Sequence, residues 1–380
     1  MNMAYVMPQP AIALPPSITF DSIRLDTKPT ASLECSQVQG IGESGYSDIL
    51  VVFLNGLIAP QAFWLPIMAL ILRRLDSSDS GAAGSHGSRP QMLAYDRYGQ
   101  GRTIDRDPSD EGKEEGYGHD TLNVAHDLHQ LISQVTRDSE SPKRIMFVAN
   151  SIGCAVARLY AQNHPGTVAG MLLLDSIMAN SDFVSIFPDP DGRGFDPGSL
   201  PQDVTPKMLR ETRKKFREVF HPSVKNPEGL DRRNLATLLP DADKPSLDQG
   251  FGGRPPLVTV VGHDPEWFAK ESLQSWMETP ISISMNYTNP VWHRYNQGLS
   301  YHHVYNRRQQ THNERTHQIG PNMPDPNKTN PAGFANTNFT KHQPPKVVDF
   351  SAVKFTKGVT VDNVKYQKFD KPKTTQKKQK

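Results

Sequence analysis

The stretch Arg144 to Asp175, RIMFVANSIGCAVARLYAQNHPGTVAGMLLLD, decides the fold class of this chain. Ile145 to Val148 form a short apolar run typical of a buried strand, and Cys154 to Asn163 have helical spacing. Met171 to Leu174 form a second apolar run and predict the next strand. Ser151 stands on the tight turn between the first strand and the helix. The order strand, turn, helix, strand predicts an α/β protein with a mostly parallel sheet.

Ser151 is the candidate nucleophile. A serine on a sharp strand-to-helix turn has a strained backbone that needs small neighbours, here Ala149 and Gly153. The turn exposes the hydroxyl above the sheet. The amide of Ile152, at the helix N-terminus, would point at a developing oxyanion and is one candidate donor of an oxyanion hole.

Four stretches, in this order, resemble the α/β-hydrolase superfamily over roughly residues 17 to 300. They are LVVFLNGLIAPQAFW (50–64), LAYDRYGQGRT (93–103), the turn at Ser151, and LVTVVGHDP (257–265). The first is similar to a strand with an oxyanion loop, although Asn55 stands where histidine is usual. The second is similar to YDxxGxGxS with Thr103 in last place, and at the turn Ala149 replaces the first glycine of GxSxG.

The resemblance implies an α/β-hydrolase fold, in which helices cover both faces of the sheet and a cap or lid is inserted over the serine. The expected parts are a lead (1–16), the first part of the core (17–177), the cap (178–254), the second part of the core (255–299) and a polar, basic tail (300–380). Further predicted strands are 18–26, 31–40, 50–54, 92–95 and 257–261, and predicted helices are 61–75, a helix capped by Asp120, 206–220 and 231–239. The charged loop 105–118 is expected to be exposed.

A serine nucleophile needs a base to take its proton and an acid to orient that base. Asp264 and Asp175 each follow an apolar strand, where open α/β sheets place their sites. We favour Asp264, which follows the strand 257–261. Asp175 is the alternative acid, because a turn or capping role explains it equally well.

The base is not identified, because the GH motif that usually carries the superfamily's histidine does not follow Asp264. His263 adjoins Asp264 and is not expected to orient against its own neighbour. The histidines further on are His293, His302, His303, His312, His317 and His342, of which His302, His303 and His317 are kept as candidates. Either the histidine has moved, or the C-terminal part is not native family sequence, for instance through a shifted reading frame. The abrupt change in composition near Ser300 favours the second explanation, which would leave a sheet edge and an apolar face uncovered.

The charge of the chain is concentrated in its tail. Residues 343–380 contain ten lysines and three aspartates, whereas the whole chain of 380 residues has a net charge of +2. With few core-forming residues, the tail is expected to be solvated and disordered rather than to bind nucleic acid, although 347–355 and 359–369 could pair as a hairpin. No apolar run is long enough to span a bilayer, no secretory signal is evident, and Cys35 and Cys154 cannot form a disulfide framework. We therefore expect a cytoplasmic protein; its oligomeric state stays open.

No cofactor or metal is expected. Neither YGQGR nor GFGGR matches a dinucleotide or phosphate loop. The neighbours His119 and Asp120, like His126 and Asp127, would project in different directions from a helix, and we interpret His126 and His129 as surface residues.

The sequence predicts an esterase, lipase or thioesterase that cleaves a small to medium apolar acyl substrate through a Ser151 acyl-enzyme. The amides of Ile152 and Leu57 would hold the oxyanion. Serine rather than aspartate at the turn argues against epoxide hydrolase or dehalogenase chemistry, which in this superfamily uses a carboxylate nucleophile. The alternative is a catalytically impaired scaffold that acts as a binding or interaction protein, which shares every feature except a working histidine.

Overall fold

The structure, a computed structural model, describes residues 14–42, 46–78, 88–139 and 141–300. The chain divides into two compact units, residues 1–312 and 313–380, and every element given below belongs to the first. The predicted tail hairpin and the candidates His302, His303 and His317 lie outside the described residues.

A seven-stranded sheet, in the order β1-β2-β4-β3-β5-β6-β7, forms the centre of the described part. The strands are β1 (Ile18–Leu25), β2 (Lys28–Val38), β3 (Ile49–Leu54), β4 (Gln91–Tyr95), β5 (Arg144–Asn150), β6 (Val168–Leu174) and β7 (Leu257–Val261). β2 pairs antiparallel with β1 and β4, and all other neighbours are parallel. The predicted mostly parallel sheet is confirmed, and strand 257–261 has the predicted bounds.

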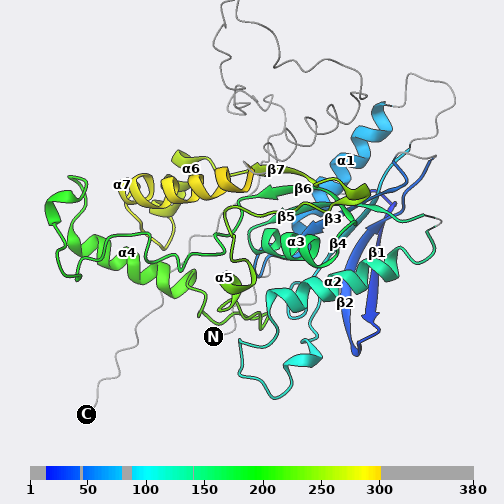
Figure 1. Cartoon of the computed structure of the whole chain (residues 1–380), viewed down its shortest axis with the longest axis horizontal. Helices are drawn as coiled ribbons and strands as arrows, with labels where there is room; N and C mark the ends of the chain where they lie inside the picture. Colours follow the sequence, from blue (N-terminus) through cyan, green and yellow to red (C-terminus); the bar gives the residue numbers. More distant parts are fainter. Residues whose placement is uncertain (1–13, 43–45, 79–87, 140, 301–380) are drawn as a thin grey trace, which may run out of the picture. The chain divides into compact units, whose positions relative to one another are not determined.

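Helices cover both faces of this sheet (Figure 1). The helices are α1 (Leu65–Ser78), α2 (Thr121–Val135), α3 (Ile152–Asn163), α4 (Pro206–Val219), α5 (Leu235–Leu238), α6 (Pro265–Gln274) and α7 (Ile281–Ile283). Met68 and Leu72 of α1 pack on one face with Phe53 of β3. Residues of α2 and α3 pack on the other face in a separate buried cluster. The two clusters give the layered α/β arrangement that the alternating pattern predicts.

α2 begins where the sequence predicts it. The Asp120 side chain accepts a hydrogen bond from the amide of Asn123, and the Asn123 side chain accepts one from the Asp120 amide. His126 is exposed, as predicted, but His129 is not a simple surface residue. It is half-buried, its Nδ1 lies 3.1 Å from the Tyr160 hydroxyl, and its ring stacks on His164 at 3.7 Å between centroids. The contact arises because α2 and α3 pack side by side.

The loop 105–118 was expected to be exposed, and this prediction is wrong in part. Asp107 is buried because the Lys28 ammonium lies 2.6 Å from its carboxylate, which compensates the charge. Within the loop, Asp107 is therefore anchored in the interior, whereas Arg106, Ser109 and residues 111–115 are exposed as predicted.

The segment between β6 and β7 contains α4 and α5. Thr205 caps α4 and Pro206 occupies its first turn. Phe216 is buried and packs edge-on against Phe187 at 4.8 Å between ring centroids. The helix predicted at 231–239 is shorter, because the Asp231 amide is bonded to the His119 carbonyl and holds the start of that segment extended.

One side of β7 is open to solvent, whereas Val258 and Val260 on the other side pack against the core. Leu257 is 55% exposed and Val261 is 42% exposed, and within the described residues β6 is the one strand that pairs with β7. Whether a last strand is lost, as the sequence suggested, stays a prediction, because residues 301–380 lie outside the described part. Within the part of the chain that the structure describes, no helix combines the length and apolar character needed to cross a membrane.

Candidate active site

Ser151 lies on a strained turn between β5 and α3. Its φ of 52° and ψ of −118° belong to a region that non-glycine residues rarely adopt. Such a conformation costs about 1–3 kcal/mol and persists only where surrounding contacts fix it. The Ser151 amide donates to the Leu174 carbonyl at 3.1 Å, and the Ser151 carbonyl accepts from the amides of Cys154 and Ile177. The end of β6 and the residues that follow it therefore fix the backbone of the Ser151 turn.

Gly153 permits the sharp start of α3. A Cβ at this position would lie 2.6 Å from the Leu54 carbonyl oxygen and 2.8 Å from that of Asn55. These are backbone atoms that cannot turn aside, so only glycine lets the helix begin so close to the end of β3. Gly153, the small residue predicted from the sequence two positions after Ser151, is thus needed for packing as well as for the turn.

The loop after β3 runs next to Ser151. A Cβ on Gly56 would lie 3.4 Å from the Ser151 Cβ and 2.8 Å from the Asn150 Oδ1. No acceptor for the Leu57 amide is found among the described residues. Ile152 is the first residue of α3, so its amide has no partner within the helix. The two predicted oxyanion donors are thus amides without a backbone acceptor among the described residues, and they lie on the two segments that meet at Ser151.

Asn55, which stands where the resemblance leads one to expect histidine, is directed into the protein. Its Nδ2 donates to the Tyr95 carbonyl at 2.8 Å and to the Gln100 Oε1 at 3.0 Å, and its Oδ1 accepts from the Trp64 Nε1 at 2.7 Å. All of its side-chain contacts hold neighbouring segments together, which is a structural role.

The two candidate acids are in different surroundings. Asp264 is the N-cap of α6, and its carboxylate accepts from the Trp267 amide at 2.7 Å. Asp175 has a φ of 45° at the end of β6, and its Oδ1 lies 2.7 Å from the Nδ1 of His263. Of the two, Asp175 is the carboxylate that contacts a histidine.

His263 is held on both sides. Its Nε2 lies 3.2 Å from the Oδ1 of Asn289, whose Nδ2 donates to the Pro265 carbonyl. The ring also stacks on Phe268 at 4.3 Å between centroids. Burial alone would lower the pKa of His263, but the hydrogen bond and charge of Asp175, with the Asn289 contact, hold that pKa above its ordinary value. Both ring nitrogens face acceptors, which favours the imidazolium form.

The Asp175–His263 pair lies next to the backbone of Ser151. The residue before Asp175, Leu174, accepts a hydrogen bond from the Ser151 amide. Two residues after Asp175, the Ile177 amide donates to the Ser151 carbonyl. No ring nitrogen of a described histidine is bonded to the Ser151 hydroxyl in this structure. Of the histidines that follow Asp264, His293 is the one within the described residues, and it is exposed.

His263 was not expected as the base, because in the sequence its neighbour is Asp264. The pairing of two parallel strands brings it to Asp175 instead: Leu174 of β6 is opposite Val261 of β7, and the Asp175 amide donates to the Val261 carbonyl. Parallel neighbours end at the same edge of a sheet, so residues following each strand can meet there.

Cys154, one turn into α3, does not offer a second nucleophile. Burial raises the pKa of its thiol to about 12, so the thiol stays protonated near neutral pH. Its Sγ lies 3.2 Å from the Ala149 carbonyl oxygen, a contact inside the core.

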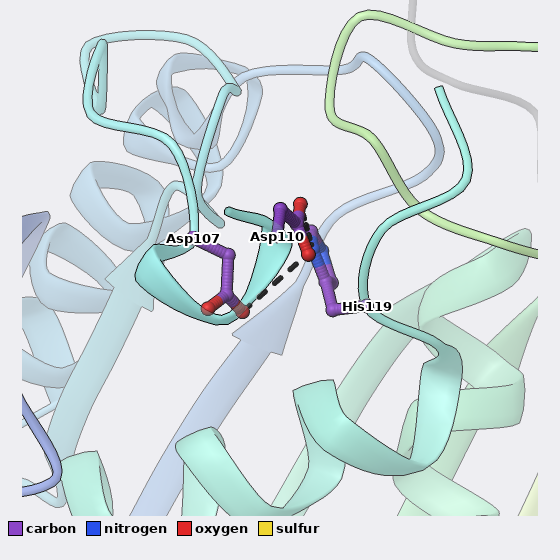
Figure 2. A group of neighbouring side chains, drawn as sticks. All are labelled: Asp107, Asp110 and His119. Carbon is purple, nitrogen blue, oxygen red and sulfur yellow. Dashed lines mark hydrogen bonds and ion pairs between the residues drawn. The ribbon is translucent and has the colours of Figure 1, made fainter. Parts of the chain in front are cut away.

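Asp107, Asp110 and His119 form a compact group, drawn in Figure 2, with ligand atoms within 4.8 Å of one another. The His119 Nδ1 lies 3.0 Å from the Asp110 Oδ2 and 3.6 Å from the Asp107 Oδ2. The same Asp107 oxygen already binds the Lys28 ammonium, which also binds Asp127 at 2.6 Å. Burial would raise the pKa of Asp107, but Lys28 and the Ser109 amide hold it below its usual value. A metal ion there would be repelled by the lysine, and we assign the group to the anchoring of loop 105–118.

The sequence matches the alpha/beta hydrolase family over residues 51–298, a span that contains the loop after β3, the Ser151 turn and β7. The chain belongs to this family. The match supports a hydrolase in general, and it confirms the resemblance found in the four sequence stretches.

Three solved structures illustrate the similarity. Cfl2 from Burkholderia cenocepacia is 19% identical over 52% of this chain and 56% of its own, with a TM-score of 0.31. A carboxyl esterase from Bacillus coagulans is 13% identical over 70% of this chain and 97% of its own, with a TM-score of 0.33. An epoxide hydrolase from Vigna radiata is 17% identical over 42% of this chain and 38% of its own, with a TM-score of 0.29. The chain thus spans about half or less of the first and third of these proteins. No curated protein sequence matches the chain.

Proposed function

We propose that the protein is a serine hydrolase that cleaves an ester or thioester of a small to medium apolar acyl group, with Ser151 as nucleophile. The observation that supports the proposal is the strained backbone of Ser151, next to the loop that carries the Leu57 amide and directly before the Ile152 amide at the start of α3. Two preorganised donors beside a nucleophile are what the oxyanion of an acyl transfer requires.

The proposed reaction passes through an acyl-enzyme. The Ser151 Oγ attacks the acyl carbon and its proton passes to a histidine, while the carbonyl electrons move to the oxygen held by the two amides. The tetrahedral intermediate then expels the alcohol or thiol, which takes the proton. Water then attacks the acyl-serine in the same way, which releases the carboxylic acid and regenerates the Ser151 hydroxyl.

We propose Asp175 and His263 as the acid and base of this reaction. Asp175 would orient the ring through Nδ1, and Nε2 would take the serine proton after leaving the Asn289 oxygen. Asp264, favoured from the sequence, would instead serve α6 as its cap. Residues 178–254, which contain α4 and α5, would form the cap over the site and shape the acyl pocket.

A panel of p-nitrophenyl esters and acyl thioesters with chains of increasing length tests this function. We expect hydrolysis of the shorter and middle members, with a rate that rises as pH is raised through the elevated pKa of His263, because the base must lose its proton. The His263–Asp175 ion pair in turn stabilises the fold below the ordinary histidine pKa and loses that contribution as pH rises through the elevated pKa of His263. No turnover of any ester by folded protein at any pH would contradict the proposal.

One observation favours the second candidate, a catalytically impaired scaffold. The His263 Nε2 is directed at Asn289 and not at Ser151 in this structure. Such a scaffold would bind apolar acyl compounds without releasing product, so binding without turnover in the same panel would identify it.

A further inference from the structure

The carbonyl groups of the loop after β3 are held by two side chains of the stretch DRYGQG. Arg97 donates from Nη1 to the Asn55 carbonyl and from Nη2 to the Gly56 carbonyl, both at 2.9 Å. Gln100 donates from Nε2 to the same Gly56 carbonyl at 3.0 Å. Arg97 is 4% exposed and Gln100 is 2% exposed, so these bonds are shielded from water.

Glu228 completes this arrangement from a distant part of the chain. It lies between α4 and α5 and is 1% exposed. Its Oε2 accepts from the Arg97 Nε at 2.8 Å, and its Oε1 accepts from the Gln100 Nε2 at 3.1 Å and from the Ile58 amide. A Cβ on Gly99 would lie 3.0 Å from the Glu228 Cα, so this glycine allows the close approach.

Arg97 and Glu228 form a buried ion pair, with side chains that are 4% and 1% exposed. Burial alone would lower the pKa of Arg97, but the Glu228 charge and hydrogen bond raise it above its usual value. A buried ion pair is tolerated where further hydrogen bonds satisfy both groups, and here the loop carbonyls and the Ile58 amide supply them. The pair thus acts as a fixed frame rather than as a mobile surface contact.

The frame determines the direction of the Leu57 amide. The carbonyl of Gly56 and the N–H of Leu57 belong to one trans peptide unit and point in opposite directions. Anchoring that carbonyl on Arg97 and Gln100 therefore turns the Leu57 N–H away from them. The next peptide unit is anchored as well, because Ile58, held at a φ of 56°, donates its amide to Glu228.

We propose that Arg97, Gln100 and Glu228 are positioning residues that preset the Leu57 amide as an oxyanion donor for the reaction at Ser151. The inference rests on the proposed serine hydrolase function and deepens it. It also gives the segment 178–254 a role in catalysis, since Glu228 of that segment helps to fix the loop that carries the Leu57 amide.

Two conservative variants test the inference. Arg97→Lys keeps the charge opposite Glu228 but loses the planar fork that reaches both carbonyls. Gln100→Met removes a neutral donor and leaves the ion pair in place. The control is Gln61→Met, a like change at a buried glutamine whose Nε2 binds the Glu34 carbonyl at 2.8 Å and whose side chain does not contact the loop carbonyls.

The readout compares an ester with its thionoester, in which sulfur, a weaker acceptor, replaces the carbonyl oxygen. A misdirected oxyanion donor should slow the ester far more than the thionoester. We expect kcat for the ester to fall about 10- to 100-fold in both variants with KM nearly unchanged, and the preference for ester over thionoester to fall roughly tenfold. Gln61→Met should keep the wild-type preference, whatever it does to the melting temperature.

The outcomes separate the two proposals. A wild-type protein that hydrolyses neither substrate overturns the proposed function and this inference together. An active wild type with an unchanged preference in Arg97→Lys and Gln100→Met overturns the inference alone. Equal losses on ester and thionoester would also overturn it, because they would indicate a general structural role.

Discussion

Ser151→Ala is expected to abolish ester hydrolysis while the protein stays folded. Removing the nucleophile of a serine hydrolase typically costs about 10⁶-fold in kcat, because the base and acid have no function without it. The Ser151 hydroxyl has no hydrogen-bond partner among the described residues, so its removal should cost little stability. The measurement is kcat and KM on the best ester of the panel, with a thermal melt of the same sample.

Ser176→Ala is the matched control. Ser176 is a buried serine close by, whose hydroxyl donates to the Ile177 carbonyl at 3.3 Å. Its loss should cost on the order of 1 kcal/mol of stability and leave kcat within a few-fold of wild type. Activity that survives in Ser151→Ala at the level of this control would exclude Ser151 as the nucleophile.

Asp175→Asn is expected to lower kcat about 10³- to 10⁴-fold. An asparagine keeps the shape of the carboxyl group but favours the wrong tautomer of the base and does not stabilise the imidazolium that forms during attack. The pKa of His263 should fall in this variant, because the contact that raises it is lost. Steady-state kinetics and an NMR titration of the His263 ring measure the two effects.

Asp264→Asn distinguishes the two candidate acids. Asparagine caps helices as well as aspartate does, so α6 should keep its start and only the charge is removed. We expect kcat to stay within about threefold of wild type in this variant. A large loss in Asp264→Asn together with near-normal Asp175→Asn would return the acid role to Asp264, as the sequence alone favoured.

The fold could be predicted from the sequence because its signals are local. The apolar runs that became β5, β6 and β7 are each bounded by turn residues, and Asp120 marks the start of α2. Within the loop 105–118, the burial of Asp107 was missed because it depends on Lys28, a residue on β2 that no local pattern connects to Asp107.

The site could be predicted where one segment carries it and not where several meet. Ser151 and Ile152 belong to one turn, so their relation is visible in the sequence. The contact of Asp175 with His263 depends on the pairing of β6 with β7, and the contact of Arg97 with Glu228 joins residues 131 positions apart. Such pairs form through tertiary packing, which the hydrophobic periodicity and the composition of single segments do not predict.

Fluorophosphonate labelling of the purified chain, with the modified residue located by peptide mass mapping, tests most directly whether Ser151 is an activated nucleophile. Phosphonylation requires a serine whose proton a base removes, and it does not depend on knowing the substrate. We predict a single adduct at Ser151 that is absent from Ser151→Ala and strongly reduced in Asp175→Asn. A folded protein that carries no adduct at Ser151 at any pH would contradict the hydrolase proposal and favour the binding scaffold.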